Sequence, residues 1–445
     1  MLLDQILIYG GVLLLSGGII WYYLRRINQA SQITQNKIEK AKETGRYEPN
    51  SLHPHIDLTT CIGSGACVKA CPEKDILGIV NGKATVINAT SCVGHGACFH
   101  ACPVEAISLK IGTESRGVEL PHVDQTYETN MKGIYIAGEL GGMGLIKNSV
   151  EQGKQAVENI FRKEKSPKKG VLDLLIIGAG PAGIAGSLTA KKLGLSFITL
   201  EQDTLGGTVY SFPRSKIVMT HPMELPLFGK VKLFDTSKDE LLGVWNNALN
   251  ENEVVIVENT KVDRIIPTSD DTFKVYDTNE QEYITNHVLI AIGRRGSPRK
   301  LNIPGESLPK VAYRLIESEH IRNKKIVVVG GGDSAVESAM LLMDQNEVTL
   351  SYRKEQFARI KTDNLKRIES AIKDKKINVV FESNLVQIEP EHVVIAQKNK
   401  ENNVTLANDL VYIFVGGELP TTFLKNAGVE INKRFGMIVK SHKNK

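Results

Sequence analysis

All six cysteines of this chain lie in two copies of one short pattern, which constrains the fold more than any other feature of the sequence. The first copy reads CIGSGACVKACP and the second reads CVGHGACFHACP. Corresponding cysteines lie 31 residues apart, and Pro72 or Pro103 follows the last cysteine of each copy. Scattered core cysteines would not repeat at one offset, and disulfides require an oxidising compartment. We therefore predict that the six thiolates hold metal clusters.

Both copies resemble the bacterial two-cluster ferredoxin run C-x2-C-x2-C-x3-C-P, in which the last cysteine binds the other cluster. They depart from it at one position, because Ser64 and His95 replace the second cysteine. The resemblance implies two iron–sulfur clusters that are held crosswise. One set of ligands is Cys61, Cys67 and Cys102, and the other is Cys92, Cys98 and Cys71.

The type of cluster stays open at this point. Three thiolates suit a 3Fe–4S cluster, or a 4Fe–4S cluster whose fourth iron takes Ser64, His95 or an exogenous ligand. Histidine replaces cysteine in some two-iron centres, so His95 is either a ligand or a donor to a cluster sulfide. Ser64 is expected to act as a hydrogen-bond donor.

The N-terminal segment 6–24 contains no charged residue over 19 positions, which is long enough for a membrane-spanning helix. Trp21 lies near its end, and Arg25 and Arg26 follow directly. A cleaved signal peptide would instead carry its basic residues before the apolar run. We predict a single-pass anchor, with the catalytic part in the cytoplasm because the positive charge follows the span. The polar stretch 25–51 is expected to form a helical stalk.

A second signal begins at a predicted strand, 172–177, which leads into Gly178, Gly180 and Gly183 with the spacing G-x-G-x-x-G. Glu201 ends the next predicted strand, 23 residues after Gly178. The glycines permit a tight turn and a close approach of the backbone to a pyrophosphate, and the acid accepts ribose hydroxyls. The spacing predicts a dinucleotide site, which we assign to FAD.

A second copy of this junction follows the predicted strand KKIVVV, and here the same offset holds Arg353 in place of an acid. An arginine suits a 2′-phosphate because the guanidinium pairs with phosphate through two hydrogen bonds. We therefore predict an NADP site, with NAD as the alternative if Arg353 is only a solvated surface charge. The expected site residues are Gly330, Gly332, Asp333, Ser334, Arg353, Lys354 and Arg359.

Residues from about 171 to 445 resemble the thioredoxin-reductase-like branch of the flavoproteins that have two dinucleotide-binding domains. The run IAIGRRGSPRKLNIPGE resembles the A-T-G strand of this family, and LGGT resembles its loop beside the isoalloxazine. The run GGGDSAVE resembles its pyridine-nucleotide motif. The resemblance implies FAD contacts from Gly206, Gly207, Thr208, Ala291 and Gly293.

The chain departs from this family in two ways. The stretch 309–326 has no cysteine, so the redox-active C-x2-C of thioredoxin reductases is absent. The family also closes with a strand, a glycine–acid pair that contacts FAD and a helix, and this sequence ends before such a segment. Residues 117–160 resemble the missing piece, with Gly138 and Glu139 as the pair. We predict a circular permutation; the alternative is an unrelated segment and a truncated domain.

These patterns predict an α/β fold with two Rossmann-like three-layer dinucleotide-binding domains, a small α+β ferredoxin-like domain and one N-terminal transmembrane helix. The expected segments are an anchor (1–24), a stalk (25–51), the ferredoxin-like domain (52–111), the permuted closing segment (112–165), the FAD domain (171–296), the NAD(P) domain (297–413) and a return to the FAD domain (414–445).

The predicted function is that of a membrane-anchored NAD(P)H:acceptor oxidoreductase. NADPH would pass electrons through FAD to the clusters and on to an acceptor, or the flow would run in reverse. The expected partner is a quinone or a redox protein such as a ferredoxin, a cytochrome or a rubredoxin-like carrier, and we expect a homodimer. The dispersed charge gives no support to nucleic-acid binding. The alternatives are a reductase of low-molecular-weight disulfides and a membrane-bound redox sensor. No acid–base catalytic residue is identified.

Overall fold

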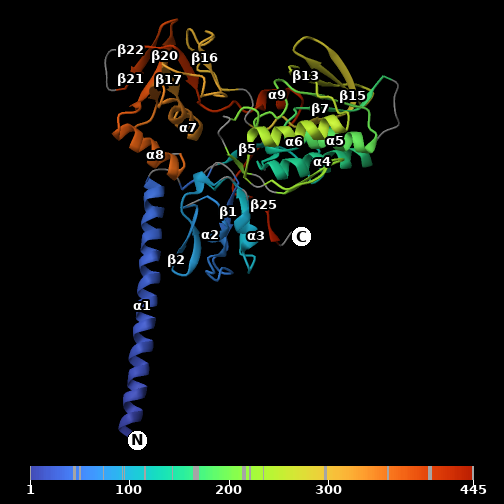
Figure 1. Cartoon of the computed structure of the whole chain (residues 1–445). Coiled ribbons are helices and arrows are strands. Elements are labelled where there is room, and N and C mark those ends of the chain that lie inside the picture. Colours follow the sequence, from blue (N-terminus) through green and yellow to red (C-terminus); the bar gives the residue numbers. More distant parts are fainter. Residues whose placement is uncertain are drawn as a thin grey trace. The chain divides into compact units, whose positions relative to one another are not determined.

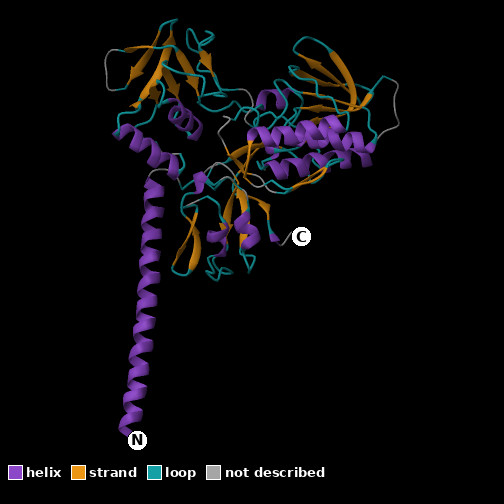
Figure 2. Ribbon diagram, in the orientation of Figure 1, coloured by secondary structure: helices purple, strands orange, loops and turns teal. Residues whose placement is uncertain are grey.

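The computed structural model of the chain describes residues 2–43, 47–49, 52–73, 75–92, 94, 96–114, 117–142, 144–163, 170–212, 217–219, 222–233, 235–294, 298–357, 360–398 and 403–442. Contacts between residues divide the chain into two units. The first unit contains Met1–Gly117 and Phe435–Lys445, and the second contains Val118–Arg434. Figures 1 and 2 show the helices and strands of both units.

The first unit begins with one continuous helix, α1 (Leu2–Glu43), which contains the predicted anchor from Leu2 onward and residues 25–43 of the predicted stalk (Figure 1). Its second half packs on the strand β2 (Leu77–Val80), and Ser31, Ile38 and Ala41 are buried there. The predicted helical stalk is therefore part of α1 and contacts the cysteine-containing part of this unit.

Among the residues that the structure describes, none of the helices is both long and apolar enough to cross a membrane. The predicted transmembrane anchor and the membrane localisation that was based on it are therefore wrong. The physical reason lies in the composition of the uncharged run. Four of its positions are glycines and others are serine and tyrosine, so freedom from charge overstates how apolar the helix is.

The cysteine repeat folds around a three-stranded antiparallel sheet in the order β1-β4-β25. The central strand β4 has alternately buried and half-buried residues, and Pro54 lies in an edge strand, where a missing N–H is tolerated. A hairpin of β2 and β3 and two short helices complete the repeat. The elements are β1 (Leu52–Ile56), β3 (Lys83–Val86), β4 (Ile107–Ile111), β25 (Met437–Lys440), α2 (Ala66–Ala70) and α3 (Ala97–Ala101).

The strand β25 differs from the prediction for the C-terminal segment. Residues 414–445 were expected to return to the FAD domain, whereas Phe435–Lys445 belong to the first unit. The backbone of β25 pairs with β4, and the ring of His442 stacks on Phe99 at 3.7 Å between centroids. Just before it, β24 (Ile431–Arg434) pairs with β5 (Val118–Pro121) in the second unit.

The first half of the second unit is built on a six-stranded sheet. The long strand β15 pairs with β7 along one edge, while its other edge pairs with β14 at the start and with β6 at the end. The core strands are almost fully buried because helices α4 and α5 cover one face and α9 packs on the other. The elements are β6 (Ile134–Ile136), β7 (Leu172–Ile177), β8 (Phe197–Leu200), β13 (Val262–Pro267), β14 (Phe273–Asp277), β15 (Glu282–Ile290), α4 (Ile146–Arg162), α5 (Pro181–Leu193), α6 (Lys238–Glu251) and α9 (Thr421–Asn426).

Two small hairpins, β9 with β12 and β10 with β11, accompany this half, and helix α6 packs its buried Trp245 with α5. The hairpin strands are β9 (Ile217–Met219), β10 (Met223–Leu225), β11 (Gly229–Val231) and β12 (Asp235–Ser237).

The second half of this unit contains a five-stranded parallel sheet in the order β16-β23-β17-β18-β19, with helices α7 and α8 and a three-stranded antiparallel sheet. The mixed α/β fold that the glycine junctions predict is confirmed. The elements are β16 (Val311–Ala312), β17 (Lys325–Val329), β18 (Glu347–Ser351), β19 (Asn378–Val380), β20 (Ser383–Ile388), β21 (His392–Gln397), β22 (Val404–Ala407), β23 (Leu410–Ile413), α7 (Asp333–Leu342) and α8 (Thr362–Lys373).

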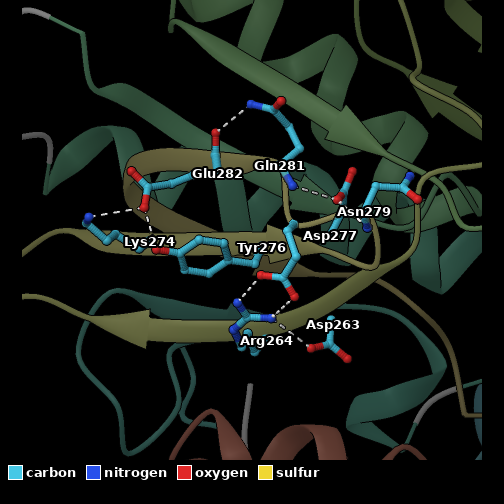
Figure 3. A network of polar contacts seen from close by, with 9 residues as sticks. Asp263, Arg264, Lys274, Tyr276, Asp277, Asn279, Gln281 and Glu282 are labelled. Atoms are coloured by element: carbon cyan, nitrogen blue, oxygen red, sulfur yellow. Dashed lines mark hydrogen bonds and ion pairs between the residues drawn. The ribbon is translucent and has the colours of Figure 1, made fainter.

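A network of charged side chains lies on the antiparallel strands β13 to β15 (Figure 3). The guanidinium of Arg264 lies 4.3 Å from the centre of the Tyr276 ring and donates to Glu280. The ammonium of Lys274 pairs with Glu282 at 3.1 Å. Exposed ion pairs of this kind add little stability, and none of these residues lies at the strand ends that carry the glycine motifs. We assign the network a structural role only.

Candidate functional site

Three parallel strands end at the same edge of the six-stranded sheet. In the register, Ile290 at the end of β15 lies opposite both Ile136 of β6 and Ile177 of β7. The residues that follow these strands are Gly138, Ala291 and Gly178, so one edge collects site residues from three separate segments. Ligands of α/β sheets bind outside the carboxyl ends of the strands, which places the expected FAD site here.

The first glycine motif is required by close backbone packing. A Cβ on Gly183 would lie 1.8 Å from the carbonyl oxygen of Gly178, and one on Gly178 would lie 2.7 Å from the carbonyl oxygen of Ala291. Gly178 also has a φ of +100°, and Gly180 precedes the first turn of α5. The tight junction leaves the N-terminus of α5 open toward a pyrophosphate.

Glu201 follows strand β8 and is buried, with 5% of its surface exposed. Its carboxylate accepts hydrogen bonds from the N–H of Ala179 at 2.7 Å and from the N–H of Asp203 at 3.0 Å. Burial raises the pKa of Glu201, which these two N–H donors oppose. The carboxylate therefore fixes the glycine loop, and its remaining lone pairs suit ribose hydroxyls.

The loop after Glu201 folds back on the first glycine motif. The N–H of Gly206 donates to the carbonyl of Ala179 at 2.9 Å, and a Cβ on Gly207 would lie 3.6 Å from the Cα of Gly180. Both glycines have positive φ, and Thr208 follows them directly. The structure thus brings this loop to the sheet edge where FAD is expected, beside the loop of Ala291 and Gly293.

The segment predicted to close the FAD domain follows β6. Gly138 has a φ of +85° and its N–H donates to the side chain of Gln152 at 2.8 Å, while Glu139 opens a short 3₁₀ turn. Helix α4 then packs against α5 so closely that a Cβ on Gly153 would lie 2.0 Å from the carbonyl oxygen of Ala182. This is the pairing and packing that the permutation hypothesis requires.

Arg294 is a residue that the sequence analysis missed. It follows Gly293, and burial lowers its pKa while Glu139 and, more weakly, Glu119 favour its charged form. A half-buried guanidinium within electrostatic reach of Glu139 adds a positive charge at the sheet edge where FAD is expected. The doubled arginine directly after the A-I-G run is the signal that could have identified it.

The second glycine motif shows the same kind of close packing. Gly330 has a φ of +140°, and a Cβ there would lie 2.3 Å from the carbonyl oxygen of Phe414. A Cβ on Gly331 would enter the ring of Tyr352, a contact that the sequence analysis missed although Tyr352 directly precedes Arg353. Gly332 precedes α7, whose first turn exposes Ser334.

The sequence predicts that Asp333 binds a nucleotide, but in the structure its side chain bonds to other residues of the protein. Its carboxylate accepts hydrogen bonds from the N–H of Lys361 at 2.8 Å and from the side chain of Asn364 at 2.7 Å. Burial raises its pKa, which these donors oppose. These contacts join the start of α7 to the start of α8, so Asp333 positions these two helices relative to each other.

Arg353 and Lys354 are exposed and follow β18, at the sheet edge where the Gly330 loop also begins. This is the edge at which a 2′-phosphate of a nucleotide on the second glycine motif is expected. Arg359 lies outside the described residues.

All six cysteines lie outside disulfide bonds, and three of them are buried. Cys67 lies within electrostatic range of Cys61 and Cys102. These three line one pocket together with Ser64. Among the cysteines, Cys92 and Cys71 raise the pKa of Cys98 most and Cys67 raises it less, whereas the pKa of Cys71 is raised by Cys67. The pocket joins cysteines of both copies, and the crossed assignment of all six cysteines to two clusters stays a prediction.

The chemistry of these thiols fits bound iron. Burial raises the pKa of Cys92 to about 11 and that of Cys98 to about 12, so neutral thiols require a cation before they lose their protons. Within the described residues, no three ligand side chains converge on a point that could hold a single metal ion. Thiols that surround a pocket suit a cluster with several metal atoms better than one ion.

Ser64 and His95 replace cysteine in the ferredoxin run, and of these two the structure describes Ser64. The side chain of Ser64 is exposed and its oxygen accepts a hydrogen bond from the N–H of Ala66 at 3.5 Å, at the start of α2. His95 lies outside the described residues.

The two glycine junctions and the two groups of cysteines define a class of protein, an oxidoreductase with two dinucleotide-binding sites and an iron–sulfur domain. Residues 175–444 match the pyridine nucleotide-disulphide oxidoreductases, and the chain belongs to this family. Residues 53–103 match the 4Fe-4S dicluster domain. The predicted resemblances to thioredoxin-reductase-like flavoproteins and to two-cluster ferredoxins are confirmed.

Several known oxidoreductases are similar to this chain. The bacilliredoxin reductase of Bacillus subtilis is 27% identical over 267 residues, which cover 59% of this chain and 82% of that protein. A ferredoxin–NADP reductase of Ignicoccus hospitalis is 28% identical, with 58% and 82% covered. The structure of the bacillithiol disulfide reductase of Bacillus cereus superimposes with a TM-score of 0.51 at 22% identity, covering 61% of this chain and 85% of that one, and shows the shared fold. The predicted NAD(P)H-dependent flavoprotein oxidoreductase is confirmed.

Proposed function

We propose that this protein transfers electrons between NADPH, FAD and two iron–sulfur clusters, and that a carrier protein is the external partner. The observation that carries the proposal is the pocket lined by Cys61, Cys67 and Cys102, which joins cysteines of both copies, in a flavoprotein that lacks the family dithiol in 309–326. FAD exchanges two electrons with a nicotinamide and releases them singly, and clusters carry one electron at a time. The similarity to a ferredoxin–NADP reductase supports a ferredoxin-like partner.

The residues of the chain have separate tasks in this proposal. Gly178 and Gly183 let the backbone approach the FAD pyrophosphate, and Glu201 binds the ribose. Helix α4 starts at the sheet edge that holds Gly138, so the positive end of the helix stabilises negative charge on the flavin. The proposal also includes the permuted closing segment 112–165, clusters of the 4Fe–4S or 3Fe–4S type, and a homodimer.

Arg353→Glu is expected to weaken the binding of NADPH far more than the binding of NADH. The change removes a charge-assisted hydrogen bond and adds repulsion toward the 2′-phosphate, in all about 2–5 kcal/mol. KM and kcat for both nucleotides measure the effect. Arg367→Glu is the matched control, because Arg367 is an exposed residue in α8 and the charge change is the same. Equal losses for NADPH and NADH would show that Arg353 does not read the phosphate.

Cys71→Ser and Cys61→Ser test the crossed ligation and the function together. Although both belong to the first sequence copy, Cys71→Ser is expected to change the same paramagnetic resonance signal as Cys92→Ser, and Cys61→Ser the other signal. Each variant should keep its FAD and lose most NADPH-dependent reduction of a ferredoxin. If Cys71→Ser and Cys61→Ser alter the same signal, the ligand sets follow the sequence copies and the crossed assignment is wrong.

A second candidate function is the reduction of a low-molecular-weight disulfide, which the similarity to bacilliredoxin reductase favours. This reaction would not need the clusters. Disulfide reduction that persists unchanged in Cys61→Ser, when ferredoxin reduction is equally unaffected, would favour this candidate over the electron-transfer proposal.

A further inference from the structure

The hairpin β2–β3 lies between the two cysteine copies and has a two-residue turn. Asn81 and Gly82 form this turn with φ values of +49° and +73°, and Val80 pairs with Lys83 across it. Two consecutive positive φ values are typical of the tight turn that an Asn-Gly pair favours. The turn therefore fixes where Lys83 begins the second strand.

The hairpin contacts the loop of the first cysteine directly. A Cβ on Gly63 would lie 1.9 Å from the carbonyl oxygen of Gly82, so the two backbones touch. The ammonium of Lys83 donates to the carbonyl of Cys61. The sulfur of Cys61 accepts from the N–H of Ala84 and from the N–H of Gly63, each at 3.4 Å. The Cys61 sulfur thus accepts two N–H hydrogen bonds, and the Cys61 carbonyl accepts one from the ammonium of Lys83.

The second cysteine loop, although similar in sequence, packs on Leu52, through its side chain and its carbonyl oxygen, and on Leu109. A Cβ on Gly94 would lie 2.9 Å from the Cβ of Leu52, and one on Gly96 would lie 3.4 Å from a methyl group of Leu109. These positions correspond to Gly63 and Gly65 of the first loop. The two loops therefore share their cysteine pattern but have different neighbours, and the contact with Lys83 belongs to the first.

Helix α1 fixes the hairpin in place. The side-chain oxygen of Ser31 accepts from the N–H of Asn81 at 3.0 Å, and Lys37 pairs with Asp75 at 2.6 Å. A Cβ on Gly78 would lie 2.6 Å from a methyl group of Thr34, so helix and hairpin touch. The position of Lys83 is thus determined from both sides, by α1 and by the Cys61 loop.

We propose that Lys83 raises the reduction potential of the cluster held by Cys61, Cys67 and Cys102 above that of the other cluster. The first site is then the cluster that electrons from NADPH reach last before they leave the protein. The inference rests on the proposed function, in which both groups of cysteines hold clusters. Reduction adds negative charge, which a nearby cation and N–H donors to sulfur favour. Ile62, in the same loop, is 64% exposed, so a carrier protein can approach this site.

Lys83→Met tests the inference in an anaerobic redox titration followed by paramagnetic resonance. One cluster should become at least tenfold harder to reduce, which is ~59 mV for a one-electron couple, while the potential of the other cluster stays unchanged. Lys83→Arg, which keeps the charge, should restore the potential of the first cluster. Lys37→Met removes a positive charge from a contact with the same hairpin and should shift neither potential.

Iron and sulfide analysis of the unmodified protein separates the two claims. If it holds no clusters, the proposed function fails. If both clusters are present and Lys83→Met shifts neither potential, or shifts both equally, only the role of Lys83 is wrong. Should Lys83→Met lose a cluster during purification, Lys83→Gln, which keeps a donor to the Cys61 carbonyl, provides the same measurement.

Discussion

A fragment of residues 118–434 is expected to bind FAD, and a fragment of residues 170–434 is expected to lose it. Both contain the whole first glycine motif and Glu201, but the shorter one lacks β6 and α4. Ile134, Val157 and Ile160 of these elements are at most 1% exposed. Burial of each such side chain contributes about 1.5–3 kcal/mol, and a whole domain is stable by only about 5–15 kcal/mol.

The bound flavin is measured from its absorbance after gel filtration, with circular dichroism as a check on folding. The longer fragment corresponds to the second unit of the structure, so it keeps the pairing of β24 with β5. If the shorter fragment binds FAD as well as the longer one, the segment after residue 117 does not complete the FAD domain. The circular permutation would then be wrong.

Gly153→Ala is expected to destabilise the FAD domain strongly. The added methyl group would lie 2.0 Å from the carbonyl oxygen and 2.8 Å from the carbonyl carbon of Ala182, and these backbone atoms cannot move aside without separating α4 from α5. We expect the free energy of unfolding to fall by at least about 3 kcal/mol, the upper part of the usual range for overpacking, with loss of FAD.

Gly243→Ala is the matched control, because Gly243 lies within helix α6 and nothing approaches its added Cβ within 4 Å. Alanine in a helix interior is favoured over glycine by about 0.5–1 kcal/mol, so this variant should be slightly more stable. Thermal unfolding and flavin content compare the two. If both variants gain stability, α4 does not pack on α5 as the structure has it.

Local sequence patterns predict the parts of this molecule whose chemistry is local. Gly178, Gly180 and Gly183 after an apolar strand predict one tight junction, and the structure shows contacts that exclude a side chain at Gly178 and Gly183. The cysteine repeat predicts the 4Fe-4S dicluster domain that residues 53–103 match, because the spacing of the cysteines is specific to such sites. In each case the residues that specify the feature lie within one motif.

Features that depend on contacts between distant segments could not be predicted in this way. Nothing near Gly153 indicates that its neighbour is Ala182, and nothing in the short apolar run of β25 indicates that its partner is β4. In the sequence, Lys83 looks like any other lysine after an Asn-Gly turn. Only the structure shows that the Gly63 loop lies beside it. The anchor prediction for the N-terminal run fails for another reason. It rests on the absence of charge and neglects the glycines and tyrosines of the run.

The most direct test of the central claim is electron exchange between NADP(H) and the clusters in the purified protein under anaerobic conditions. NADP⁺ added to the dithionite-reduced protein, or NADPH added to the oxidised protein, should change the cluster signals in paramagnetic resonance as the flavin absorbance changes. Removal of FAD should abolish the exchange. If the flavin responds to nucleotide in both directions while the clusters keep their oxidation state, the chain does not connect its two halves by electron transfer.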